Sequence, residues 1–91
     1  MVFNQLINEG YILLGNAEAS RGRLQEAVVA WRTALATRFD PTIAAEAAEA
    51  ITEVEGHVTE EAAALFRRAL AESSADTPWR PMAEKRLSEL K

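Results

Sequence analysis

The chain carries one internal repeat: EAVVAWRTALA at residues 26–36 returns as EAAALFRRALA at residues 61–71. Six of the eleven aligned positions are identical, and the two large aromatic residues Trp31 and Phe66 coincide. The offset is 35 residues, a period typical of repeat proteins built from pairs of helices. We therefore expect Trp31 and Phe66 to be the same core residue used twice, filling the space between successive units of a stack of paired helices.

The residues around this repeat predict five helices. Alanine, the best helix former, is the commonest residue, and the alternating apolar pattern of strands is missing. Asp40 and Thr77, each directly followed by proline, and Thr59 mark helix starts, whereas Gly56 marks a helix end. The predicted helices span residues 3–20, 24–37, 41–55, 60–73 and 78–90. The expected fold class is all-α, with short loops that make neighbouring helices antiparallel hairpins.

Composition narrows the classes of function. Ten Lys and Arg against fourteen Asp and Glu give a net charge of −4, whereas a general nucleic-acid binder needs a basic face. The absence of cysteine excludes disulfides, zinc–thiolate sites and cysteine nucleophiles. No apolar stretch approaches the ~20 residues of a membrane span, and the opening residues lack the basic and apolar segments of a secretory signal. As written, the chain is expected to be soluble and cytoplasmic by default, with no nucleic-acid partner and no membrane insertion.

Residues 8–41 resemble one unit of the tetratricopeptide repeat (TPR) family, and residues 43–77 resemble a second, degenerate unit. In the first unit, the positions of the family's W-x2-L-G and A-x3-F-x2-A signatures are occupied by Tyr11, Leu14, Gly15, Ala27, Trp31 and Ala34. In the second unit the later signature is matched by Ala62, Phe66 and Ala69, but the earlier one is replaced by Glu46, Glu49 and Ala50. Residues 78–90 look like the C-terminal capping helix of such an array. The resemblance implies one domain over residues 1–91, a right-handed stack of two TPR-like hairpins and a cap.

In the TPR family the first helix of each unit lines a concave groove. Projecting that register onto this chain gives six candidate groove residues: Ile12, Asn16, Ala19, Ala47, Ile51 and Val54. The surface is small and apolar around the single amide of Asn16, which favours an amphipathic helix or an apolar extended peptide as the ligand. The implied function is a non-catalytic protein–protein interaction module. The alternative is that these residues simply pack the helices together.

Two later stretches, residues 56–70 and 76–87, are similar to the TPR domain of c-type cytochrome biogenesis proteins of the CycH kind. In that family a further full repeat separates the two stretches, and membrane helices precede them. The resemblance implies a chaperone-like module, periplasmic if it is an excised domain, that holds the C-terminal helix of an apocytochrome and does not itself bind haem.

A second function class is self-association. Two repeats fall short of the roughly three that such arrays need for stability. The first helix is apolar at Phe3, Leu6, Ile7, Tyr11 and Leu14. Packing of this helix against a second copy gives a homodimer or a longer stack.

The sequence predicts no catalytic residue, cofactor or metal ligand. His57 is the only histidine and lies in a predicted turn beside Gly56, which favours a solvated side chain. The acidic run from Glu46 to Glu55 is expected to be a solvated helix face. The arginines are expected to cover the convex surface, with pairing to a partner's carboxylate as the alternative: Arg32, Arg67 and Arg68. Trp79 is expected to anchor the last helix on the preceding hairpin.

Overall fold

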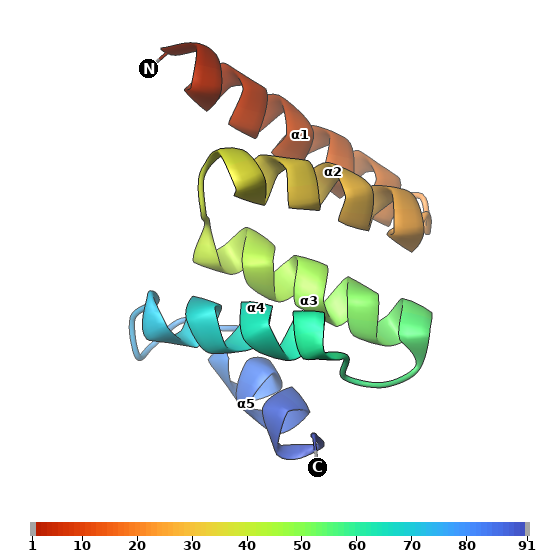
Figure 1. The fold of residues 1–91 in the computed structure, drawn as a ribbon, viewed down its shortest axis with the longest axis vertical. Helices are drawn as coiled ribbons and strands as arrows, with labels where there is room; N and C mark the ends of the chain where they lie inside the picture. The colour runs from red at the N-terminus through yellow and green to blue at the C-terminus, as the bar shows by residue number, and fades with distance from the viewer. Residues whose placement is uncertain (1, 91) are drawn as a thin grey trace.

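A computed structural model describes residues 2–90 of the chain, with side chains from residue 5 onward. The helices are α1 (Val2–Ser20), α2 (Leu24–Thr37), α3 (Pro41–Glu55), α4 (Glu60–Ala71) and α5 (Arg80–Ser88). Residues 2–90 contain no strand, which confirms the predicted all-α class of about five helices (Figure 1). The bounds of α2 and α3 are those that the sequence predicts.

Local capping explains why the middle helices begin and end where they do. The Asp40 carboxylate accepts hydrogen bonds from the backbone N–H groups of Thr42 and Ile43, at 2.9 and 3.2 Å. The Thr59 hydroxyl accepts one from the N–H of Ala62 at 3.1 Å. Gly56 ends α3 with a positive φ of 82°, a conformation that costs glycine little. These three predicted boundary signals are confirmed.

The last two helices are shorter than predicted. α4 ends at Ala71, not at residue 73, and α5 covers residues 80–88 where the sequence predicted 78–90. The N–H of Arg80 donates to the carbonyl of Thr77 at 3.1 Å, so Pro78 lies in a turn. Pro81 occupies the first turn of α5 in its place. Two prolines near one helix start made the boundary ambiguous, and the second proline is the one inside the first turn of the helix.

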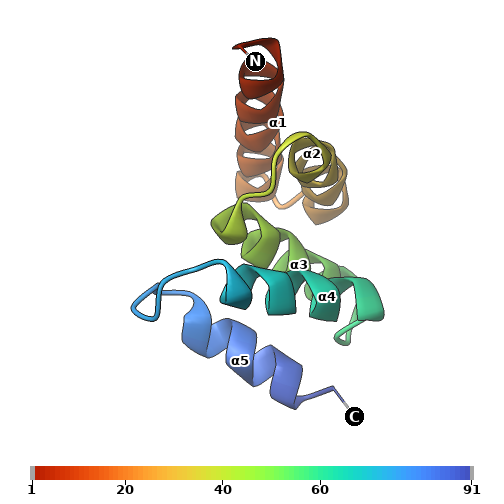
Figure 2. The same cartoon turned by 60° about the vertical axis from the view of Figure 1, so that its left-hand side comes forward.

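The helices stack in chain order, with α1 and α5 at opposite ends (Figures 1 and 2). α2 lies against α1 and α3, and α4 lies against α3 and α5. α2 and α4 lie on the same side of the stack. There the Arg32 guanidinium forms two hydrogen bonds to the Glu61 carboxylate, at 2.6 and 2.7 Å. The result is an elongated molecule of 40 × 28 × 21 Å.

The core contains both aromatic residues of the repeat. Trp31 on α2 is 3 % exposed and Phe66 on α4 is fully buried, and both belong to one apolar cluster. A methyl group added at Gly15 would come within 2.3 Å of the Trp31 indole nitrogen, so Trp31 also packs inside its own hairpin. Small residues of the repeat are also buried at matching positions: Ala27 and Ala62, Ala34 and Ala69. Gly15 thus allows the Trp31 ring of the neighbouring helix to approach α1 closely.

Candidate functional site

The structure separates the six predicted groove residues by burial. Ala47 and Ile51 are buried in the core, and Ile12 and Ala19 are half-buried against it. Asn16 and Val54 are exposed. The side-chain oxygen of Asn16 accepts a hydrogen bond from the Trp31 indole N–H at 3.3 Å, so this amide orients a core ring. Several predicted groove residues therefore also pack helices, and their part in binding stays a prediction.

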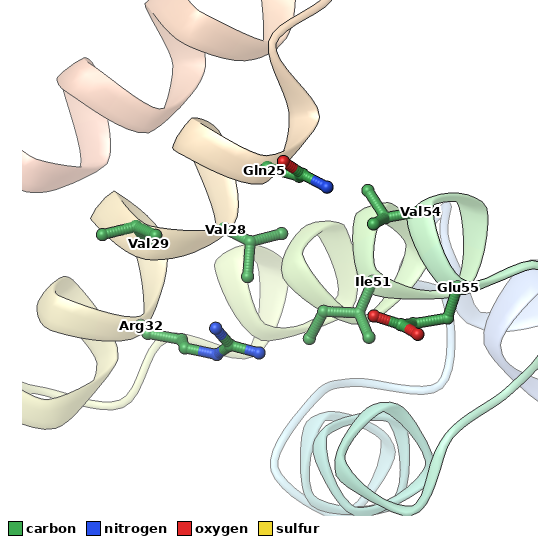
Figure 3. Close-up of a pocket in the computed structure, with 7 residues that line it drawn as sticks. All are labelled: Gln25, Val28, Val29, Arg32, Ile51, Val54 and Glu55. Carbon is green, nitrogen blue, oxygen red and sulfur yellow. The ribbon is translucent and has the colours of Figure 1, made fainter.

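Two of the six residues line a hollow between α2 and α3 (Figure 3). Ile51 and Val54 of α3 face α2 across it, whereas the α1 residues of the predicted set take no part in its lining. Its other lining residues are Gln25, Val28, Val29, Arg32 and Glu55. The hollow thus has an apolar middle with one amide and two opposite charges at its edges. The α2 side of this hollow was not among the predicted residues, because the TPR register assigns second helices to the opposite surface.

Arg32 lines this hollow, and the Arg32–Glu61 pair lines a second one between α2 and α4. Hydrogen bonds from Arg32 lower the pKa of the Glu61 carboxyl below its usual value, even though both side chains are about half exposed. In the second hollow the Arg68 guanidinium stacks 3.8 Å from the centre of the Phe39 ring, and it also bonds to Glu72 at 2.7 Å. Arg32 and Arg68 are thus engaged within the chain and cover its surface.

α1 exposes a set of large apolar side chains. Leu13 is 67 % and Leu6 60 % exposed, and the set also includes Ile7, Tyr11 and Leu14. The sequence picked out the apolar character of α1 but omitted Leu13; Phe3, also predicted there, lies outside the described side chains. Between residues 6 and 14 the exposed face of α1 is therefore largely apolar.

A buried amide explains why the apolar face of α1 points outward. Asn8 is 5 % exposed and donates hydrogen bonds to the carbonyls of Ala34 and Arg38 at the end of α2, at 2.7 and 3.2 Å. Both carbonyls lie at the end of α2, where the Ala34 carbonyl also accepts a hydrogen bond from the backbone N–H of Arg38 at 3.0 Å. Gly15 and Ala19 lie on the same side of α1 as Asn8, since they follow it by seven and eleven residues. The side of α1 that carries Asn8, Gly15 and Ala19 therefore faces α2. The side that carries the large apolar residues is left exposed.

The structure also places three other residues that the sequence analysis considered: His57, Glu49 and Trp79. His57 is exposed in the turn between α3 and α4, where the sequence predicted it. Of the acidic run on α3, Glu49 departs from the expected solvated face: it is half-buried and receives two hydrogen bonds from Arg86 of α5, at 2.7 and 2.8 Å. Trp79 donates its indole N–H to the Thr42 hydroxyl at 3.2 Å. The predicted anchoring of the last helix is therefore confirmed, with the Arg86–Glu49 pair as a second attachment.

Within residues 2–90, His, Asp and Glu side chains form no group of three suited to a metal ion. No helix in the same range is both long enough and apolar enough to cross a bilayer.

Comparisons with protein-family models, with curated proteins and with solved structures found no match. The TPR and cytochrome-biogenesis resemblances therefore stay predictions from the residues.

Proposed function

We propose that this chain is a non-catalytic protein-interaction module that binds an apolar or amphipathic helical segment of a partner protein. The hollow between α2 and α3 is the observation that supports this best. Its middle is apolar, with Val29 and Val54 exposed and therefore available to a ligand. An amphipathic helix buries its apolar stripe in such a groove and keeps its polar side in water.

The charges at the edge of the hollow suit such a ligand. Arg32 already bonds to Glu61, and Glu55 lies near enough to act on the charge of Arg32. Because these charges are largely balanced within the chain, a ligand gains little by carrying a net charge of its own. Burial of apolar side chains is therefore expected to supply most of the affinity.

Selection from displayed peptides of about four helical turns tests this proposal. We expect selected peptides to repeat apolar residues every three or four positions and to bind the wild-type chain. Val54→Arg places a charge in the hollow and is expected to weaken their binding by at least about tenfold. Ala71→Arg adds the same side chain to an exposed position on α4 and serves as the control. Equal loss in both variants, or no loss in either, contradicts binding in this hollow.

A narrower form of the proposal follows from the resemblance to c-type cytochrome biogenesis proteins. There the ligand is the C-terminal helix of an apocytochrome, held before haem attachment. A synthetic peptide of that helix, titrated into the labelled chain, is expected to shift resonances of residues lining the hollow. Shifts confined to the surface around Arg67 contradict this form.

Self-association through α1 is a second candidate function. Its support is the row of exposed apolar side chains on α1, since soluble chains rarely leave a long apolar face in water without a partner. In this case the chain stabilises its short stack by joining two copies.

A further inference from the structure

The exposed face of α1 contains the kind of hole into which a second helix inserts a side chain. Ile7, Gly10, Tyr11 and Leu14 line a shallow apolar hollow. Their spacing of three, one and three residues is that of the four-residue hole in knobs-into-holes packing. A Cβ atom built at Gly10 meets no other atom within 4 Å, so the space above this glycine is open. The hollow is therefore ready to receive a large apolar side chain from another helix.

The face is also symmetric about Gly10. Leu6 and Ile7 lie four and three residues before Gly10, and Leu13 and Leu14 lie three and four residues after it. All four of these side chains are exposed. An interface between identical chains related by a two-fold axis must be complementary to itself, because the same patch serves both copies. The two pairs of leucine and isoleucine residues, one on each side of Gly10, meet that condition, whereas Tyr11 has Glu9 as its counterpart and lies at the edge of the face.

We propose that the occupant of this face is the α1 helix of a second copy, lying antiparallel, with the two-fold axis beside Gly10. This inference rests on the self-association proposed above and specifies its geometry. At about 100° per residue, Leu6 and Leu13 lie on one side of the Gly10 direction, and Ile7 and Leu14 lie on the other. The two-fold axis runs perpendicular to both helices and to the line that joins them. It therefore places each side of one α1 against the same side of the other α1. Leu6 then meets Leu13 of the second copy, and Ile7 meets Leu14 of the second copy.

Charge permits this contact. The whole chain carries −4, so two copies repel each other, and charges within the contact surface would add to that repulsion. The charged residues of α1 are Glu9 and Glu18, which project about 80–100° away from the Gly10 direction. The antiparallel arrangement also sets the positive end of each α1 dipole beside the negative end of the other, whereas a parallel arrangement brings like ends together.

Sedimentation at several concentrations tests whether a second copy is the occupant. We expect wild type to pass from monomer to dimer as its concentration rises. Leu13→Glu puts a charge on the face and is expected to keep the chain monomeric. Gln5→Glu adds the same charge to α1 outside the face and is expected to dimerise as wild type does. A wild-type chain that stays monomeric overturns both self-association and this inference, and the face then belongs to a different partner.

Disulfide cross-linking tests the geometry separately, and the absence of native cysteine makes each introduced thiol unique. In the antiparallel pair the α-carbons of the two copies of residue 13 lie at least about 9 Å apart, which is too far for a disulfide. Leu13→Cys alone should therefore stay uncross-linked. A mixture of Leu6→Cys and Leu13→Cys chains, one carrying a size tag, should give a mixed cross-linked dimer. Both positions are highly exposed, so the fold is expected to be retained, and circular dichroism checks it.

The cross-linking outcomes separate the two proposals. A wild-type dimer in which Leu13→Cys readily cross-links to itself shows a parallel pair: self-association then stands and the antiparallel inference is wrong. A wild-type dimer in which neither the single variant nor the mixture cross-links places the contact away from this face and also overturns the inference.

Discussion

Gly15 shows how a single missing side chain sets the distance between two helices. The Trp31 indole ring occupies the space in which any other residue at position 15 would place its Cβ atom. The ring is held there by the hydrogen bond to Asn16 on the next position of α1. Gly15 and Asn16 thus position Trp31, the largest aromatic side chain of the first hairpin.

We predict opposite effects for alanine at two glycines of α1. Gly15→Ala forces Trp31 to move and is expected to lower the free energy of unfolding by about 1–3 kcal/mol. Gly10→Ala enters open space within a helix and is expected to raise it by about 0.5–1 kcal/mol. Urea denaturation of dilute protein measures both. Equal stabilisation by the two substitutions would mean that helix propensity, not contact with Trp31, governs position 15.

Asn8 is the residue whose role the sequence did not indicate. A polar side chain near the middle of an apolar helix is ordinarily assigned to the solvated side. Here it is buried, and its amide is satisfied by donating to two carbonyl groups at the end of α2. The small residues Gly15 and Ala19 on the same side of α1 were the available signal, since small side chains mark the surface on which a neighbouring helix packs closely.

At the scale of elements, neighbouring helices are joined by apolar packing, and α2 and α4 are joined in addition by the Arg32–Glu61 pair. The two residues belong to the repeated segments of the chain, but to different positions within them. The pair therefore does not follow from the repeat itself. It arises because stacking brings the middle of α2 close to the start of α4.

We predict that this ion pair contributes modestly and only above acidic pH. In a double-mutant cycle, Arg32→Gln and Glu61→Gln should couple by about 0.5–1 kcal/mol at neutral pH, the range of exposed pairs. The pKa of Glu61 is lowered in the folded chain, so the contribution is present above the unfolded pKa and is lost as pH falls through the folded pKa. Urea denaturation at neutral and at strongly acidic pH measures the coupling. A coupling energy that survives protonation of Glu61 contradicts an electrostatic origin.

At the scale of the whole molecule, the stack is nearly one-dimensional. Each inner helix has a neighbour on both sides, whereas α1 and α5 each pack chiefly on one helix. In such arrays stability is the sum of each unit and its contacts with adjacent units, so the ends open first.

We predict a gradient of amide hydrogen exchange along the stack. Backbone amides of α2 and α3 should exchange slowest, and those of α5 should exchange fastest among the helices. Exchange in α1 should slow as protein concentration rises if a second copy covers its exposed face. Mass spectrometry of peptides from each helix, at two concentrations, measures this. Uniform protection along all five helices would indicate a single cooperative unit instead.

The number of helices and the bounds of α2 and α3 could be predicted from the residues alone, because capping side chains, prolines and glycines act on the backbone only a few residues away. The sequence also identified both core aromatics, since the 35-residue repeat marks them. The tertiary structure alone decided which side of α1 faces water and where α5 begins. It also decided that Ile51 and Val54 share a hollow with residues of α2. These features depend on groups far apart along the chain: the carbonyls that Asn8 satisfies, the turn at Pro78, and the approach of one hairpin to the next.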